Sequence, residues 1–242
     1  MRFAVCTANF GAWSDPQLAM RTASAAENAG WDGYFVWDHL AYVWGQPAAD
    51  TWVLLAAAAL ETERIVLGSA VTPVPRRRPQ VLAQTVATVS DLAGDRIVFG
   101  AGLGGNRSEF EAFGESYDRA RRLGLLDQGL ELLSHVWADW EIPIWIGGNS
   151  ADLIERAARH DGWIANSASK EGMTMSPDEL RLNAPAGVEV AVNGYSEAGD
   201  DELVRAYEGA GATWWLENLH DARGSDEDLL RRVEAGPPTP SS

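Results

Sequence analysis

The sequence predicts an α/β protein of the (β/α)8 TIM barrel class, a single domain with shortened connections. The stretch from Ile65 to Gly105 reads as strand, helix, strand with a short crossover, which is a parallel βαβ unit. Its two strands are nearly continuous apolar runs, as expected for strands that are covered on both faces. A strand followed by a helix recurs eight times along the 242 residues, and eight repeats favour a closed barrel over an open doubly wound sheet.

The expected strands are short apolar runs that lead into polar residues or glycines. In chain order they cover residues 2–9, 33–37, 65–71, 96–101, 142–146, 163–166, 188–192 and 212–216. The expected helices are marked by capping residues. Asp15 and Asp50 are suitable N-caps, and Ser225 with Asp228 forms a capping-box pattern. The helices should cover 16–30, 51–62, 82–94, 119–137, a segment capped by residue 149 or 150, a stunted segment at 176–182, a segment through 203–207, and 225–236.

Composition limits the kinds of partner. One domain should cover residues 1–236, and residues 237–242 are expected to form a disordered tail. The net charge of −16 argues against nucleic-acid or anionic-membrane binding, and no apolar run is long enough to span a bilayer. The single cysteine, Cys6, and the absence of a signal-peptide pattern at the N-terminus fit a cytoplasmic protein.

In such a barrel the active site lies at the carboxyl ends of the strands. The candidate residues there are Asn9-Phe10, Asp38-His39, Ala70-Val71-Thr72, the segment 102–109, Gly147 to Ser150, Asn166-Ser167, Asn193-Gly194 and Glu217-Asn218.

Asp38-His39 is the sharpest pair among them. Histidine suits proton transfer near neutrality, although His39 could instead bond a nearby carbonyl. Ser108 and Glu109 could reach the same pocket. From the pattern alone, we favour a solvated acid at the start of a helix for Glu109.

Glycines at two strand ends leave room for a ligand. Gly147-Gly148-Asn149-Ser150 joins a strand to a helix and could bind an anion, or could be a plain turn with an N-cap. Gly102 and Gly104 follow another strand without the spacing of a dinucleotide fingerprint, and they leave room for a flat ligand.

Several other side chains have competing interpretations. For the three arginines at 76–78 we favour an exposed basic loop over the attraction of an anion. Trp13, Trp37 and Trp44 could wall a pocket, whereas Trp137, Trp163 and Trp214 should pack between helices and barrel. His135 is expected to be partly buried, and His160 and His220 exposed. No metal-binding motif and no serine-hydrolase elbow is present, so no metal is expected.

Several segments together resemble the luciferase-like flavin-dependent oxidoreductase family, which includes bacterial luciferase and deazaflavin-dependent reductases. They are VWDHL, LGSAVTPVPRRRP with LAQTVATVSDLAGDRIVFGAGLG, LLDQGLELLSHVW, IPIWIGGNS and AGATWWLENL. The resemblance covers residues 1 to about 237 and implies a (β/α)8 barrel.

The resemblance also implies a cofactor and a site. FMN or a deazaflavin coenzyme would lie across the strand ends, with its ring near Asp38, His39 and a non-proline cis peptide at Ala70-Val71. It implies hydride transfer or monooxygenation of a small organic substrate, with NAD(P)H as a possible hydride donor and a possible homodimer. The positions that match cofactor-binding ones are Asp38, Ala70, Val71, Thr72, Gly102, Gly104, Ser108, Gly147, Gly148, Asn149 and Ser150, and His39 and Glu109 match catalytic positions.

The chain departs from the family pattern in two connections. The link at 137–142 and the segment around the sixth helix are shorter than usual, and such insertions cover the pocket in the family. Two alternatives therefore stay open. One is a glycosidase-type hydrolase that uses Asp38, Glu109 and Glu217. The other is a degenerate barrel that binds flavin weakly or not at all.

Overall fold

The computed structural model describes residues 1–40, 45–166, 168–169, 172–197, 201–220 and 223–238. Its main sheet has the order β3-β2-β1-β11-β10-β7-β6-β5-β4, and a further pairing of β3 with β5 closes it into a barrel. The predicted (β/α)8 fold is confirmed, because β3 and β4 are two pieces of one strand. The barrel strands are β1 Arg2–Thr7, β2 Gly33–Val36, β3 Val66–Ser69, β4 Thr72–Pro73, β5 Ile97–Gly102, β6 Ile144–Gly147, β7 Gly162–Asn166, β10 Glu189–Gly194 and β11 Trp214–Leu219.

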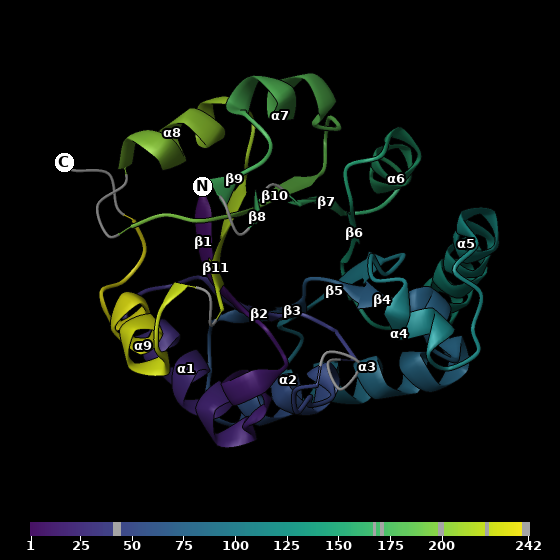
Figure 1. Ribbon diagram of the computed structural model, residues 1–242, viewed down its shortest axis with the longest axis horizontal. Helices are drawn as coiled ribbons and strands as arrows, with labels where there is room; N and C mark the ends of the chain where they lie inside the picture. Colours follow the sequence, from purple (N-terminus) through teal and green to yellow (C-terminus); the bar gives the residue numbers. More distant parts are fainter. Residues whose placement is uncertain (41–44, 167, 170–171, 198–200, 221–222, 239–242) are drawn as a thin grey trace.

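Helices surround the barrel on the outside (Figure 1). Asp15 and Asp50 accept backbone N–H bonds as N-caps, and Ser225 and Asp228 form the expected capping box. The long helices are α1 Pro16–Asn28, α2 Thr51–Leu60, α3 Pro79–Ala93, α5 Arg119–Val136, α8 Asp201–Gly209 and α9 Asp226–Glu234. Two others, α6 Ala151–Ala157 and α7 Pro177–Asn183, have seven residues each, and of these only α7 was expected to be short.

Some small elements were not expected from the sequence. They are the 3-10 turns η1 Gly11–Ser14 and η3 Val74–Arg76, the short helix α4 Ser108–Glu111, and a hairpin of β8 Ala168–Ser169 with β9 Gly172–Met173. Of the expected tail at 237–242 the structure describes Pro237 and Pro238, and Pro238 is buried. No helix of the described part is both long and apolar enough to cross a membrane.

The third strand breaks where the sequence resemblance placed an unusual peptide. The Ala70-Val71 bond is cis, and it separates β3 from β4. The neighbouring strand fits closely around the break, because a Cβ on Gly100 would lie 1.9 Å from the Ser69 carbonyl oxygen. The Val71 methyl groups fill the space where Cβ atoms of Gly102 and Gly147 would lie, at 2.4 and 2.5 Å. These two glycines therefore give Val71 its place at the top of the barrel.

Large aromatic side chains fill the barrel interior. Phe35 stacks on Trp145 with ring centroids 5.7 Å apart, and Trp214 meets both rings edge-on. Gly162 makes room for this cluster, since its Cβ would lie 2.4 Å from Trp145. Trp214 therefore lies inside the barrel, and the expectation that it packs under a helix is wrong. Trp137 and Trp163 belong to the core between barrel and helices, as expected.

Candidate functional site

A pocket with a volume of about 750 Å³ lies at the carboxyl ends of the strands. This size is within the range of small-molecule and cofactor sites. Most of the predicted site residues line it: Asp38, His39, Ala70, Val71, Gly104, Glu109, Gly147, Gly148, Asn149 and Ser150. The strand ends thus locate the pocket as the fold predicts.

Three predicted cofactor-binding residues do not line the pocket. The Thr72 hydroxyl is fully buried and accepts a hydrogen bond from the Trp52 indole at 3.2 Å, so it faces the helix layer. Gly102 packs against Val71, and Ser108 is exposed on α4. Strand position alone could not distinguish these residues from their pocket-lining neighbours.

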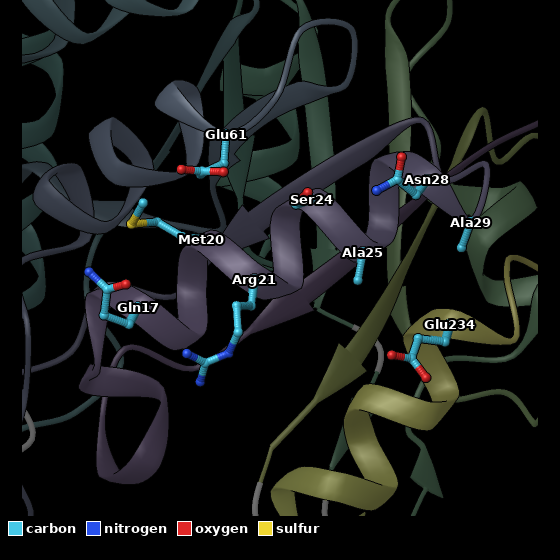
Figure 2. Close-up of a pocket in the computed structure, with 9 residues that line it drawn as sticks. All are labelled: Gln17, Met20, Arg21, Ser24, Ala25, Asn28, Ala29, Glu61 and Glu234. Atoms are coloured by element: carbon cyan, nitrogen blue, oxygen red, sulfur yellow. The ribbon is translucent and has the colours of Figure 1, made fainter.

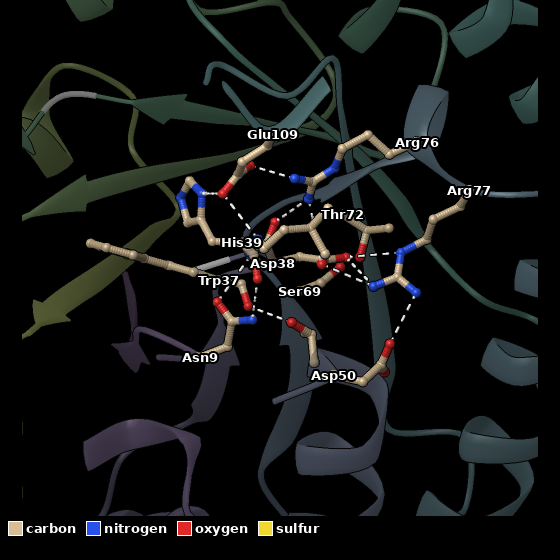
Figure 3. Close-up of polar contacts among 12 residues, drawn as sticks. Asn9, Trp37, Asp38, His39, Asp50, Ser69, Thr72, Arg76, Arg77 and Glu109 are labelled. Carbon is tan, nitrogen blue, oxygen red and sulfur yellow. Dashed lines mark hydrogen bonds and ion pairs between the residues drawn. The ribbon is translucent and has the colours of Figure 1, made fainter. Parts of the chain in front are cut away.

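A buried set of charges surrounds Glu109 (Figure 3). Its Oε1 accepts bonds from His39 Nδ1 and from the Leu40 N–H, both at 2.9 Å, and its Oε2 pairs with Arg76. The Glu109 and Arg76 side chains are only 1% and 4% exposed. Our preference for a solvated Glu109 is therefore wrong, because α4 turns this side chain inward, and so is the exposed-loop interpretation of Arg76.

These contacts set the charge of Glu109. Burial opposes its ionisation, but the hydrogen bond from His39, the charges of His39 and Arg76, and the Leu40 N–H hold its pKa below the usual range. An ionised Glu109 fixes a proton on His39 Nδ1.

The backbone of His39 is also fixed. The Asn9 side chain accepts from the His39 N–H at 3.0 Å and donates to the His39 carbonyl at 2.9 Å. Asn9 follows β1 and His39 follows β2, and these strands pair in parallel. Two strand ends therefore hold the histidine in place, and its side chain stays 30% exposed.

Asp38 is held by arginines. Arg77 donates to both of its carboxylate oxygens, at 2.9 and 2.7 Å, and reaches Asp50 at 3.2 Å (Figure 3). Burial lowers the pKa of Arg77, but Asp38 and Asp50 outweigh it and raise that pKa. Asp38 is 4% exposed, so it acts as an anchor for this loop rather than as a solvated carboxylate.

The glycine loop after β6 is partly occupied by its own contacts. The Gly148 N–H donates to the Ile164 carbonyl at 3.1 Å, and the Asn149 side chain donates to the Asn166 carbonyl at 2.6 Å. The Ser150 hydroxyl accepts a bond from Arg119 at 2.9 Å. Arg119 also binds both carboxylate oxygens of Asp152.

Arg122 is a site residue that the sequence reading missed. It lines the pocket, is 6% exposed, and donates through Nη1 to the Gly104 carbonyl at 2.6 Å. Its Nε is buried without a hydrogen-bond partner. Among the residues that the structure describes, no carboxylate forms an ion pair with it. The sequence clue to a cation here was the arginine-rich start of the helix, at 119–122. In the structure the Arg122 guanidinium lies 3.8 Å from the centroid of the Tyr117 ring.

The wall formed by β10 and β11 carries polar and aromatic side chains. Tyr195, Asn218 and His220 line it, and Trp37 lies between His39 and His220 with centroids 5.9 and 5.6 Å away. His220 is 6% exposed, so its expected exposure is wrong. His160 is half-buried rather than exposed, and His135 is exposed rather than partly buried. Trp13 is buried outside the pocket lining, and Trp44 and Ser167 lie outside the described residues.

Glu217 is fully buried within β11. It accepts bonds from the Ser196 N–H at 3.0 Å and the Trp215 indole at 3.0 Å, and pairs with Arg223 and Arg232. Asp38, Glu109 and Glu217 are thus all buried and paired with arginines. A glycosidase needs one carboxyl that can give up a proton and one that is free to attack or to activate water. The arrangement disfavours that alternative.

A second hollow, of about 620 Å³, lies on the outer surface beside α1 (Figure 2). Gln17, Arg21, Glu61 and Glu234 on its rim are exposed. It lies on the helix layer, away from the strand ends, and holds no paired or buried titratable group. Among the described residues, no group of three or more His, Cys, Asp or Glu could hold a metal ion.

The chain is a closed (β/α)8 barrel with a histidine–carboxylate pair in a pocket at its strand ends, where enzymes of this fold have their active sites. The family model for luciferase-like monooxygenases matches residues 1–234, so the chain belongs to the luciferase-like monooxygenase family.

Individual relatives agree with this assignment. An F420-dependent glucose-6-phosphate dehydrogenase of Beutenbergia cavernae is 38% identical over 124 residues, which are 49% of this chain and 36% of that protein. The protein of the same name from Nakamurella multipartita is 34% identical over 198 residues, 70% of this chain and 57% of the relative. The chain thus matches between about a third and three fifths of the length of these relatives. An F420-dependent secondary alcohol dehydrogenase, solved with an F420-acetone adduct, has a TM-score of 0.80 at 15% identity and covers 98% of each chain.

Proposed function

We propose that this chain is a deazaflavin-dependent oxidoreductase that transfers hydride between coenzyme F420 and a small organic substrate. The observation that carries the proposal is the His39–Glu109–Arg76 set, which opens onto a pocket of coenzyme size beside Val71. The relatives named as F420-dependent dehydrogenases favour the deazaflavin over FMN.

The pocket residues fit such a coenzyme. Ala70 and Val71 form an apolar floor at the break between β3 and β4, suited to a flat ring. Arg122 supplies a buried cation with an unpartnered Nε, and Arg119 stands beside it on α5. Because the whole protein carries a net charge of −16, local cations are what an anionic coenzyme would need here. Asp38, Ala70, Val71, Gly104 and the loop 147–150 would hold the ring and its tail.

The bound coenzyme would supply hydride transfer, and the chain would supply proton handling and orientation. His39 Nε2 would exchange a proton with the substrate oxygen, since Nδ1 is held by Glu109. Glu109 touches His39 rather than the open pocket floor, and its low pKa keeps it ionised. It would therefore orient His39 and stabilise its protonated form.

FMN is the second candidate cofactor. The family model is that of the monooxygenases, and reduced FMN with NAD(P)H as hydride donor would suit that chemistry. A degenerate, non-binding barrel is the remaining alternative. The short link at 137–142 and the short α7 motivate it, because they leave less chain to cover the pocket.

The test is a turnover assay that follows the visible absorbance of coenzyme F420 in the presence of alcohols and aldehydes, in parallel with FMN and NAD(P)H. We expect reduction of F420 by at least one alcohol, and loss of that signal with His39→Ala. A protein that binds both cofactors but turns over neither with any donor would refute the oxidoreductase proposal.

A further inference from the structure

The polar wall at the ends of β10 and β11 is organised around a Tyr–His contact. The Tyr195 hydroxyl and His220 Nε2 are 2.8 Å apart, and the rings meet edge-on with centroids 5.7 Å apart. Burial raises the pKa of Tyr195, so the phenol keeps its proton at neutral pH.

Two arginines lie behind this wall, and both approach the same carboxylate. Arg223 pairs with the fully buried Glu217, donates to the Asn218 carbonyl at 2.8 Å, and lies 4.9 Å from the Tyr195 ring centroid. Arg232 also approaches Glu217, at 3.5 Å. In the described part of the wall, each cation therefore faces a carboxylate. Among the described residues of this wall, no arginine or lysine lines the pocket, and Tyr195, Asn218 and His220 do.

One acceptor on this wall has no partner. Asn218 lines the pocket and is 3% exposed, and its Oδ1 is buried without a hydrogen bond. A buried polar atom left unpaired is unfavourable, and a ligand that supplies a donor removes that penalty. The wall lies across the barrel from the Val71 floor, because β10 is four strands away from β3 in either direction around the sheet.

We propose that Tyr195, Asn218 and His220 form a substrate-recognition subsite for the hydroxyl group of an uncharged alcohol. The O–H of a hydroxyl that does not react would donate to Asn218 Oδ1, with the carbon skeleton against Trp37, and the reacting hydroxyl would be left to His39. A phosphorylated substrate would gain no cation from this wall. The inference rests on the proposed function, since it places the substrate opposite the coenzyme floor.

The test uses the full chain with 13C-labelled histidine, first alone and then with coenzyme F420. The chain has only four histidines, so their signals can be assigned by substitution. The probes are cyclohexanol and D-glucose as neutral hydroxyl compounds and D-glucose 6-phosphate as the matched anion. We expect at least one neutral probe to shift the His220 signal while that of His135, exposed on α5, stays unchanged.

Two variants and one control separate recognition from structure. Asn218→Leu and Tyr195→Phe should each weaken binding of the neutral probe about tenfold, as loss of one hydrogen bond predicts. Tyr117→Phe removes a phenol from the opposite side of the pocket, where it donates to the Gly105 carbonyl, and should leave the His220 shift intact.

The subsite is overturned if neither neutral probe moves His220, or if D-glucose 6-phosphate binds tenfold or more tightly than both. It is also overturned if both folded variants bind the neutral probe as well as the native chain. An absorbance titration with coenzyme F420 on the same sample separates the two claims. Coenzyme binding without a probe effect refutes the subsite alone, and a probe effect without coenzyme binding refutes the proposed function alone.

Discussion

At the scale of single residues, the protein places a histidine beside a buried, fixed carboxylate. His39 is partly exposed to the pocket, whereas Glu109 is buried among three donors. Removing the imidazole should therefore lower the turnover rate much more than it weakens coenzyme binding. We expect His39→Ala to lower turnover by about 10²- to 10⁴-fold, the usual range for a lost general acid or base. The coenzyme dissociation constant should change little. Steady-state kinetics with a parallel binding titration checks this, and unchanged turnover would exclude the role.

Arg76 should matter for stability, because it pairs with a buried carboxylate. Arg76→Leu leaves Glu109 without its cation, and we expect a loss of about 3 kcal/mol in the free energy of unfolding. The matched control is Arg107→Leu. Arg107 pairs with Glu111, both side chains are more than half exposed, and the change should be below about 0.5 kcal/mol. Denaturant unfolding measures the loss of stability in both variants. Equal losses would contradict the claim that the buried ion pair of Arg76 stabilises the fold more than the exposed pair of Arg107.

The low pKa of Glu109 predicts the direction of a pH effect. A carboxyl whose pKa is lower in the folded state adds stability above its unfolded pKa of about 4.3, and this stability is lost as the pH falls through the folded pKa. Glu109→Gln should therefore lose less stability between pH 7 and pH 3 than the native chain. Urea unfolding across that range provides the comparison. An identical pH dependence in both proteins would mean that Glu109 is not shifted.

At the scale of elements, the fit between strands depends on glycines. A Cβ on Gly100 would lie 1.9 Å from the Ser69 carbonyl oxygen, so the backbone itself would have to move. We expect Gly100→Ala to destabilise the protein by about 3 kcal/mol. Gly124 lies in α5 with nothing near its Cβ position, and Gly124→Ala should stabilise by about 0.5–1 kcal/mol. Thermal unfolding of the two variants measures both changes in stability. If both variants were less stable than the native chain, the packing described here would be contradicted.

The elements also show what the sequence could predict. Apolar runs and caps such as Asp15 and Asp50 located the main helices and strands, because those signals are local. The inward turn of Glu109 and the burial of Arg76 depend on α4 and η3, two short elements with no periodic signal. Thr72 and Val71 are sequence neighbours on opposite sides of the strand. Only the broken strand shows which of them reaches the pocket.

At the scale of the whole molecule, the closed sheet brings chemistry from distant parts of the chain together. His39, Arg122 and His220 line one pocket, because β2 and β11 end and α5 begins at the same face of the barrel. The sequence showed that strand ends matter, but not that Arg122 on α5 or His220 beyond β11 would reach the pocket. Whether the chain forms a homodimer stays a prediction, which sedimentation against the 26.2 kDa monomer would test.

The most direct test of the central claim is a binding titration of the purified chain with coenzyme F420 and with FMN, followed by absorbance and tryptophan emission. Trp37 lines the pocket and should report occupancy by quenching. We expect saturable binding of F420 with quenching, and additional stability of about 2.7 kcal/mol at a hundredfold excess over the dissociation constant. A folded protein that binds neither cofactor would contradict the proposed function.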